Sequence, residues 1–246
     1  MQEKSKVIIV ISGLGLALSW NAITWADDLT LYYHPRPPYA AVQPNGEVTG
    51  ITADIAANAL AMAGISYHWE EMPSARQLVV LKENASAACG LGWFKRPERE
   101  AFANFSAALY KDHPTVAVSR ADDARFPETP SIAQLFADKR LVLLLKNGYS
   151  YGPQIDAWIK AGAPSSRTSS TDNIAMLRLV ERQRVDYMLM ASEEANYLLA
   201  QPDFASGNLK IHNLSDAPEG EVRYLMCTHM VPPALMDKLD QAIPPL

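Results

Sequence analysis

The stretch from residue 29 to residue 69 reads LTLYYHPRPPYAAVQPNGEVTGITADIAANALAMAGISYHW, and it sets the expectation for the fold. Residues 29–33 alternate at the period of a β-strand. Residues 49–63 carry apolar side chains at helical spacing until Gly64 ends the pattern. A second alternating segment follows at residues 65–69. Strand, helix and strand in this order predict an α/β fold.

The same alternation continues to the end of the chain. Two serines precede helical patterns at the spacing of a capping box, Ser74 with Gln77 and Ser131 with Gln134. Further strands are predicted at residues 85–89, 115–118, 141–145, 185–190, 209–211 and 222–227, and further helices at 75–83, from 131 on, and at 153–161, 172–183, 192–199 and 233–243.

The N-terminus has the pattern of a secretory signal peptide. Lys4 and Lys6 precede an apolar run at residues 7–18, and Thr24 and Ala26 are small residues at the −3 and −1 positions of a cleavage site. The run is shorter than the roughly 20 residues of a membrane-spanning helix. No cysteine follows it to accept a lipid. We therefore expect a monomeric periplasmic protein that begins after Ala26 and has no stable membrane anchor.

The composition excludes several classes of function. The 246 residues carry a formal net charge of −5 and include no basic run, so nucleic acid and anionic membranes are poor partners. The five histidines are scattered, and neither H-E-x-x-H nor C-x-x-C gathers them into a metal site. No G-x-S-x-G or Walker motif is present. The sequence thus predicts no cofactor, no metal and no catalytic residue.

Only two cysteines occur, Cys89 and Cys227. Each follows or ends an apolar strand pattern, which favours two buried free thiols. The alternative is a disulfide, which an oxidising compartment would permit, across a loop of roughly 140 residues.

Several short motifs carry a resemblance to a known family. They are Pro37-Pro38-Tyr39 after the first strand, residues 46–50 leading into Asp54-Ile55, the segment WFKRPERE at residues 93–100, and Phe105-Ser106 followed by Tyr110. In this order the chain, from residue 29 to about 243, resembles the family 3 extracellular solute-binding proteins, which serve amino-acid ABC importers.

The resemblance implies a type II periplasmic-binding-protein fold. Its two α/β lobes have mostly parallel sheets covered by helices and are joined by crossing strands. We expect lobe 1 to comprise residues 27–117 and 222–246, and lobe 2 to comprise residues 118–221. A ligand would bind between the lobes, and an inner-membrane permease would recognise the closed form. The family usually continues with a further helix beyond Ile243.

The resemblance assigns the ligand carboxylate to Arg99. This residue occupies the Glu-Arg position that clamps the carboxylate in the family, and a guanidinium matches a carboxylate with two parallel N–H donors. The alternative is that Arg99 pairs with Glu98, Glu100 or solvent on a charged helix.

Residues near these motifs are candidates for the walls of the ligand pocket. Trp93, Phe94 and Tyr39 offer aromatic faces, as small-molecule pockets commonly do, although aromatic side chains are also ordinary core. Arg36 offers a second positive group or lies exposed in its loop.

In the second lobe, the family places a hydroxyl-bearing loop at a helix N-terminus after the first strand. Residues 147–152 stand there, and Ser150 and Tyr151 are the expected ligand contacts. Backbone N–H groups at such a terminus favour an anion.

One position departs from the family. Amino-acid binders carry an aspartate for the ligand ammonium where this chain has Ala191. Ser192 or Glu193 is a possible substitute, and a carboxylate without an amine, or another polar solute, is an open alternative to an α-amino acid.

The predicted function is the binding of a small polar, carboxylate-bearing solute for an ABC importer. Two alternatives use the same fold. A periplasmic dehydratase-like enzyme would use Glu193 as general acid. A ligand sensor would present its closed form to a membrane receptor.

Overall fold

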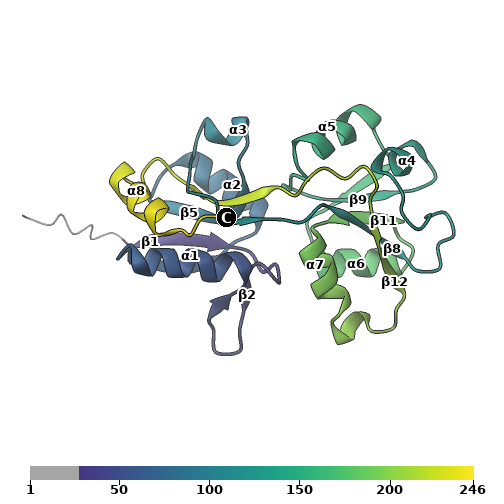
Figure 1. Ribbon diagram of the computed structural model, residues 1–246, viewed down its shortest axis with the longest axis horizontal. Coiled ribbons are helices and arrows are strands. Elements are labelled where there is room, and N and C mark those ends of the chain that lie inside the picture. Colours follow the sequence, from purple (N-terminus) through teal and green to yellow (C-terminus); the bar gives the residue numbers. More distant parts are fainter. Residues whose placement is uncertain (1–27) are drawn as a thin grey trace, which may run out of the picture.

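The computed structural model describes residues 28–246, which form two α/β lobes lying side by side, each built around one large sheet (Figure 1). The predicted signal peptide falls outside the described residues. Among the helices of residues 28–246, none is both long and apolar enough to cross a membrane.

The first lobe is built on a six-stranded sheet in the order β4-β1-β5-β13-β6, with β7 also paired to β13. Helix α1 packs against α8, and α2 packs against β5. The strands are β1 (Leu29–Tyr33), β4 (Tyr67–Glu71), β5 (Ala88–Phe94), β6 (Asn104–Phe105), β7 (Tyr110–Lys111) and β13 (Val222–Cys227). The helices are α1 (Ile51–Met62), α2 (Ser74–Glu83), α3 (Pro97–Glu100) and α8 (Pro233–Ala242), and a small hairpin pairs β2 (Ala41–Val42) with β3 (Val48–Thr49).

Strand β1 shows why its sequence alternates. Leu29, Leu31 and Tyr33 enter the core beneath α1 and α8, whereas Tyr32 enters a second core on the opposite face. Successive strand side chains point to opposite faces, so both faces of this central strand are buried. The apolar character of β1 therefore follows from its place in the middle of the sheet.

The second lobe is built on a five-stranded sheet in the order β10-β9-β11-β8-β12. In its central strand β11, Tyr187 and Leu189 enter one core while Met188 and Met190 enter the other. The strands are β8 (Val116–Arg120), β9 (Leu143–Lys146), β10 (Ser166–Ser169), β11 (Tyr187–Met190) and β12 (Leu209–Asn213). The helices are α4 (Ile132–Ala137), α5 (Pro153–Gly162), α6 (Asn173–Glu181), α7 (Ser192–Leu199) and the 3₁₀ turn η1 (Pro202–Phe204).

Two extended segments, residues 112–115 and 214–221, carry the chain between the lobes (Figure 1). Both sheets are mixed. β1 is parallel to β4 and β5, and β9 is parallel to β10 and β11, as the strand–helix–strand pattern predicts. β8 and β13, the strands that follow the two crossings, pair antiparallel with their neighbours. β8 begins at Val116 and pairs entirely within the second sheet.

One of the two predicted capping boxes is present. Ser131 Oγ accepts a hydrogen bond from the Gln134 amide at 3.0 Å, and Gln134 Oε1 accepts one from the Ser131 amide at 2.9 Å. The prediction for Ser74 is wrong, because α2 begins at Ser74 itself after Pro73. Gln77 is instead fully buried and donates to the Met72 carbonyl at 2.7 Å.

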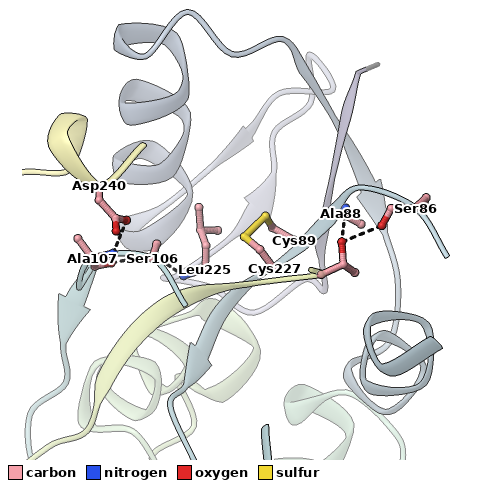
Figure 2. The surroundings of a disulfide bond; sticks show 9 residues. Ser86, Ala88, Cys89, Ser106, Ala107, Leu225, Cys227 and Asp240 are labelled. Carbon is pink, nitrogen blue, oxygen red and sulfur yellow. Dashed lines mark hydrogen bonds between the residues drawn. A yellow bond between two sulfur atoms is a disulfide. The ribbon is translucent and has the colours of Figure 1, made fainter. Parts of the chain in front are cut away.

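The two cysteines form a disulfide, so the expectation of free thiols is wrong. Cys89 of β5 and Cys227 of β13 are directly paired in the antiparallel register, with their Cα atoms 3.9 Å apart (Figure 2). Sequence patterns identified both residues as strand residues but contained no information about which strands are neighbours. The alternative left open by the sequence is therefore the one that the sheet pairing selects.

Hydrogen bonds around the disulfide connect the C-terminal part of the chain, β13 and α8, to the segments near β5 and β6 (Figure 2). Thr228 Oγ1 donates to the Ser86 carbonyl at 2.7 Å and accepts from the Ala88 amide at 3.2 Å. Asp240 of α8 accepts a hydrogen bond from the Ala107 amide at 2.6 Å. The last strand and helix are thus fixed to the first lobe by covalent, hydrogen-bond and apolar contacts together.

The disulfide closes a loop of 138 residues that includes the whole second lobe. In the chain-entropy model a loop of this length stabilises the folded state by at most about 5 kcal/mol. We expect the Cys89→Ala/Cys227→Ala variant to unfold at lower urea concentration, and dithiothreitol to lower the midpoint of the wild type but not that of the variant. If the wild type and the double variant had the same urea midpoint, with and without dithiothreitol, the disulfide would not stabilise the folded state.

Candidate functional site

The two lobes meet in a cleft lined by the ends of β1 and β5 on one side and by β9, β11 and α7 on the other. Its two central cavities have volumes of only about 30 and 40 Å³, because side chains from both lobes fill most of the space. The residues shared by both cavities are Arg36, Phe94, Tyr149, Ser150 and Arg223. A solute the size of an amino acid therefore requires the lobes to separate before it can enter these two cavities. A third cavity of about 290 Å³ lies beside them, also between the lobes, and its lining includes His34, Tyr149 and Asp172.

Arg99 lies in this cleft with only 7% of its surface exposed. One guanidinium nitrogen donates to the Phe94 carbonyl at 2.8 Å, and the group stacks 4.8 Å from the centre of the Trp93 ring. Within residues 28–246, no carboxylate lies within 4.0 Å of it. The alternative pairing with Glu98 or Glu100 is therefore absent. Burial lowers the pKa of the Arg99 guanidinium, and the nearby Arg96 lowers it further.

Trp93 and Phe94 both line the cavity beside Arg99. Trp93 is also part of the hydrophobic core, because it is buried and its Nε1 donates to Gln77 Oε1 at 3.0 Å. Phe94 is half-buried and lies beneath Arg223, whose guanidinium carbon is 4.9 Å from the ring centre. Trp93 is thus a rigid support for Arg99, and Phe94 is the more accessible aromatic wall.

Ser150 and Tyr151 stand at the start of α5, as predicted, but make different contacts. Ser150 Oγ accepts a hydrogen bond across the cleft from Arg96 at 2.7 Å and donates one to Asp156. Tyr151 lines the cleft, while its hydroxyl accepts from the Lys146 amide at 2.8 Å within the second lobe. Ser150 therefore connects the lobes, whereas Tyr151 fixes the loop that carries it.

Tyr39 does not line the central cavities. It is buried beneath them, and its hydroxyl donates to Asp112 and Glu193, each at 3.1 Å. Asp112 in turn receives two hydrogen bonds of 2.6 Å from Arg223, whose guanidinium carbon lies 3.9 Å from the Tyr39 ring centre. This buried group joins the loop after β1 to the first crossing segment, to β13 and to α7 of the second lobe.

Glu193 connects the second lobe to the first. Its carboxylate accepts hydrogen bonds from Tyr39, from the Tyr110 hydroxyl at 2.9 Å, and from the His113 amide and ring at 2.8 and 2.6 Å. Burial alone would raise the pKa of the Glu193 carboxyl, but the hydrogen bonds from His113 and Tyr110 outweigh it, and the pKa is lowered. Ser192 is not in the cleft lining, and its hydroxyl contacts Asn196 of the same helix.

Several residues of the cleft were not predicted from the sequence. Glu194 lines the cavity and binds Arg36, whereas the sequence pointed to its neighbours Ser192 and Glu193 as cleft residues. The other cleft residues that were not predicted are Lys146, Tyr149, Asn173 and Arg223. Arg223 and Glu194 lie in apolar strand and helix patterns that give no sign of their orientation. Tyr149 is the exception, since it belongs to the predicted loop at residues 147–152.

His34 and Tyr149 face each other across the cleft and share a hydrogen bond. Burial lowers the pKa of the His34 imidazole to about 3, and the charges of Arg36, Lys146 and Arg223 contribute to the shift. Burial likewise raises the pKa of the Tyr149 hydroxyl to about 12. Both groups are therefore neutral at physiological pH.

The chain matches the model of the bacterial extracellular solute-binding proteins, family 3, over residues 29–244. It belongs to this family. No curated protein sequence matches it.

Solved structures show the same fold at low sequence identity. An ancestral arginine-binding protein bound to arginine has a TM-score of 0.70 and 15% identity, with 87% of this chain and 89% of that chain covered. The arginine-, lysine-, histidine-binding protein ArtJ from Geobacillus stearothermophilus has a TM-score of 0.71 and 15% identity, with 88% of each chain covered. A structure from work on glutathione import through GshT in Streptococcus mutans has a TM-score of 0.70 and 14% identity, with 88% and 87% covered. At these identities the likeness establishes the two-lobed fold alone.

The low pKa of His34 predicts a pH dependence of stability. Between pH 6.5 and about 3 the unfolded chain binds a proton that the folded chain does not, so stability falls as the pH falls, by at most about 1.4 kcal/mol per pH unit. We expect urea denaturation of His34→Asn to show a shallower decline than the wild type in this window. His68→Asn, which makes the same change outside the cleft, is the control, and equal slopes for wild type and His34→Asn would contradict the assignment.

Proposed function

We propose that this protein binds a small carboxylate-bearing solute between its lobes in the periplasm and delivers it to an ABC importer in the inner membrane. Membership of the solute-binding family supports this role. The predicted signal peptide and the disulfide, which suits an oxidising compartment, support the location.

The observation that carries the proposal is the state of Arg99. A desolvated cation with no counter-ion is costly for a protein to maintain, so such a group points to a ligand. The residues lining the cavity beside Arg99 include His34, Arg36 and Arg223 but no aspartate or glutamate. In this cavity an incoming carboxylate would therefore meet only positive or neutral groups. Acids of the cleft line the adjoining cavity, namely Asp112, Glu194, Glu219 and Glu221. Ser150, Phe94 and Tyr149 complete the proposed site.

The enzymatic alternative has less support. The carboxylate proposed as a general acid, Glu193, is engaged by Tyr39, Tyr110 and His113 and is not among the residues that line the central cavities. A lowered pKa also favours its ionised form, which cannot donate a proton. Binding without catalysis is the function that these contacts favour.

The ligand role of Arg99 gives a measurable signature. We expect a thermal-shift screen of residues 27–246 against dicarboxylates, aromatic acids, amino acids and polyamines to yield an acid that raises Tm. In Arg99→Met the same acid should bind about 10- to 100-fold more weakly by calorimetry, because a charge-assisted pair is lost. The ligand-free variant should be as stable as the wild type, since the methionine keeps the contact with Trp93 and removes a buried charge.

Arg140→Ala is the matched control, because it removes a solvent-exposed arginine far from the cleft and should leave affinity unchanged. A ligand whose affinity is the same in Arg99→Met and the wild type would show that the carboxylate binds elsewhere. A folded protein that responds to no acid would contradict the proposed class of solute.

Export has its own test. Expressed from its own start codon in a Gram-negative host, the protein should appear in the osmotic-shock fraction with Asp27 as its first residue by mass spectrometry. A substitution of Ala26 by a bulky residue should leave the uncleaved precursor in the membrane fraction. An unprocessed wild type would refute the cleavage site.

A further inference from the structure

Arg36 projects from the loop after β1 into the opposite lobe. Its backbone is held by the tight turn in which the Arg36 amide donates to the Ala40 carbonyl at 2.8 Å, and the Arg36 carbonyl accepts from the amides of Tyr39 and Ala40. From this fixed position its Nε and one terminal nitrogen both lie 2.9 Å from Glu194 Oε2. The side chain is 14% exposed and that of Glu194 only 1%, so the pair is almost fully removed from water.

The guanidinium of Arg36 also lies between two aromatic rings, one from each lobe. Its central carbon is 5.2 Å from the centre of the Tyr39 ring and 4.8 Å from that of Tyr149. Asn173 completes the surroundings by donating to Glu194 Oε1, the carboxylate oxygen that Arg36 leaves free. Aromatic faces combined with a desolvated carboxylate are the chemistry by which proteins recognise a free guanidinium or ammonium group.

The other buried acids near the cleft are engaged by the protein as well. Asp112 is paired with Arg223 through two hydrogen bonds, and Glu193 accepts from Tyr39, Tyr110 and His113. The cavity beside Arg99 has no acidic residue in its lining. The other central cavity also has Glu219 and Glu221 in its lining. Glu219 is exposed and paired with Lys111, and Glu221 is 28% exposed and lies 3.9 Å from Arg96. A positively charged group on a ligand would therefore find no fully buried carboxylate available to it in this closed arrangement.

We infer that Arg36 determines the specificity of the cleft: it is a guanidinium built into the chain that occupies the cation-binding position between Tyr39, Tyr149 and Glu194. The protein then selects acids that carry no cationic group and rejects α-amino acids and polyamines. This inference rests on the proposed function only in taking the cleft as the binding site. Arg36 acts by occupying space and by neutralising Glu194, and it need not touch the ligand carboxylate.

The cation-binding position can be tested without knowing the natural ligand. Arg36→Ala leaves Glu194 buried and unpaired, so its Tm should fall. Ethylguanidinium chloride at 10 mM should restore part of the loss, by about 2–6 °C, because the free cation binds where the side chain was removed. The wild type should not respond, and ethylammonium, which lacks the planar fork, should restore less in Arg36→Ala.

Two variants make this result specific. Arg36→Ala/Glu194→Gln keeps the space but removes the carboxylate, so it should fold without additive and show no response to ethylguanidinium. Arg140→Ala removes an exposed arginine and should show no response either. If Arg36→Ala is unfolded alone, recovery of its folded circular-dichroism spectrum in ethylguanidinium is the readout. The inference is overturned if ethylguanidinium raises the Tm of Arg36→Ala no more than it raises that of the wild type or of the double variant.

The selectivity itself is tested with acids that differ only in the amino group, namely glutarate against glutamate and 3-phenylpropionate against phenylalanine. We expect any wild-type response to be larger for the acid without the amine, at least tenfold in affinity, and Arg36→Ala to narrow the difference. A wild type that prefers the amino acid overturns the inference. If none of the four compounds binds the wild type, the proposed class of solute loses support. The ethylguanidinium experiment then still decides the role of Arg36.

Discussion

The antiparallel pairing of β13 with β5 brings the end of the chain back into the first sheet. The chain leaves the first lobe after β7, forms the whole second lobe, and must return to complete the first sheet. The return is fixed by the ladder between β5 and β13, by the disulfide within it, and by the apolar contacts of α8 with α1. Because the chain crosses twice, two segments connect the lobes, residues 112–115 and 214–221.

The same strand carries function as well as structure. Arg223 lies at the beginning of β13, and its buried pair with Asp112 joins this strand to the first crossing segment. The Asp112 amide also donates to the Glu221 carbonyl at 2.9 Å, which joins one crossing segment to the other. Tyr39 contacts both Asp112 and Arg223 and also reaches Glu193 in the second lobe. Asp112 and Arg223 therefore belong both to the connection between the lobes and to the cavity lining. A ligand that contacts them can thereby favour one arrangement of the lobes over another.

Charge is distributed unevenly in the cleft, and this distribution is the basis of the proposed selectivity. Arg36 and Arg223 are each paired with a buried acid, whereas Arg99 is not. Desolvation makes an unpaired charge expensive and a paired one acceptable. Lys146, which also lines the cleft, has no carboxylate within 4.0 Å among the described residues either, so the unpaired charges in the cleft are positive and favour an anion.

The α/β class, the order of most strands and helices, and the motif segment that contains Arg99 could be predicted from the sequence. These features depend on local periodicity and on short motifs, which are readable along one chain. The sequence did not reveal β10, a polar edge strand whose residues 166–169 are mostly exposed and show no apolar period. The contact of Cys89 with Cys227 and that of Arg36 with Glu194 could not be predicted, because these partners are far apart in sequence and become neighbours through strand pairing and the contact between the lobes. Local patterns identify which residues are buried or charged, whereas their partners are set by the arrangement of the lobes.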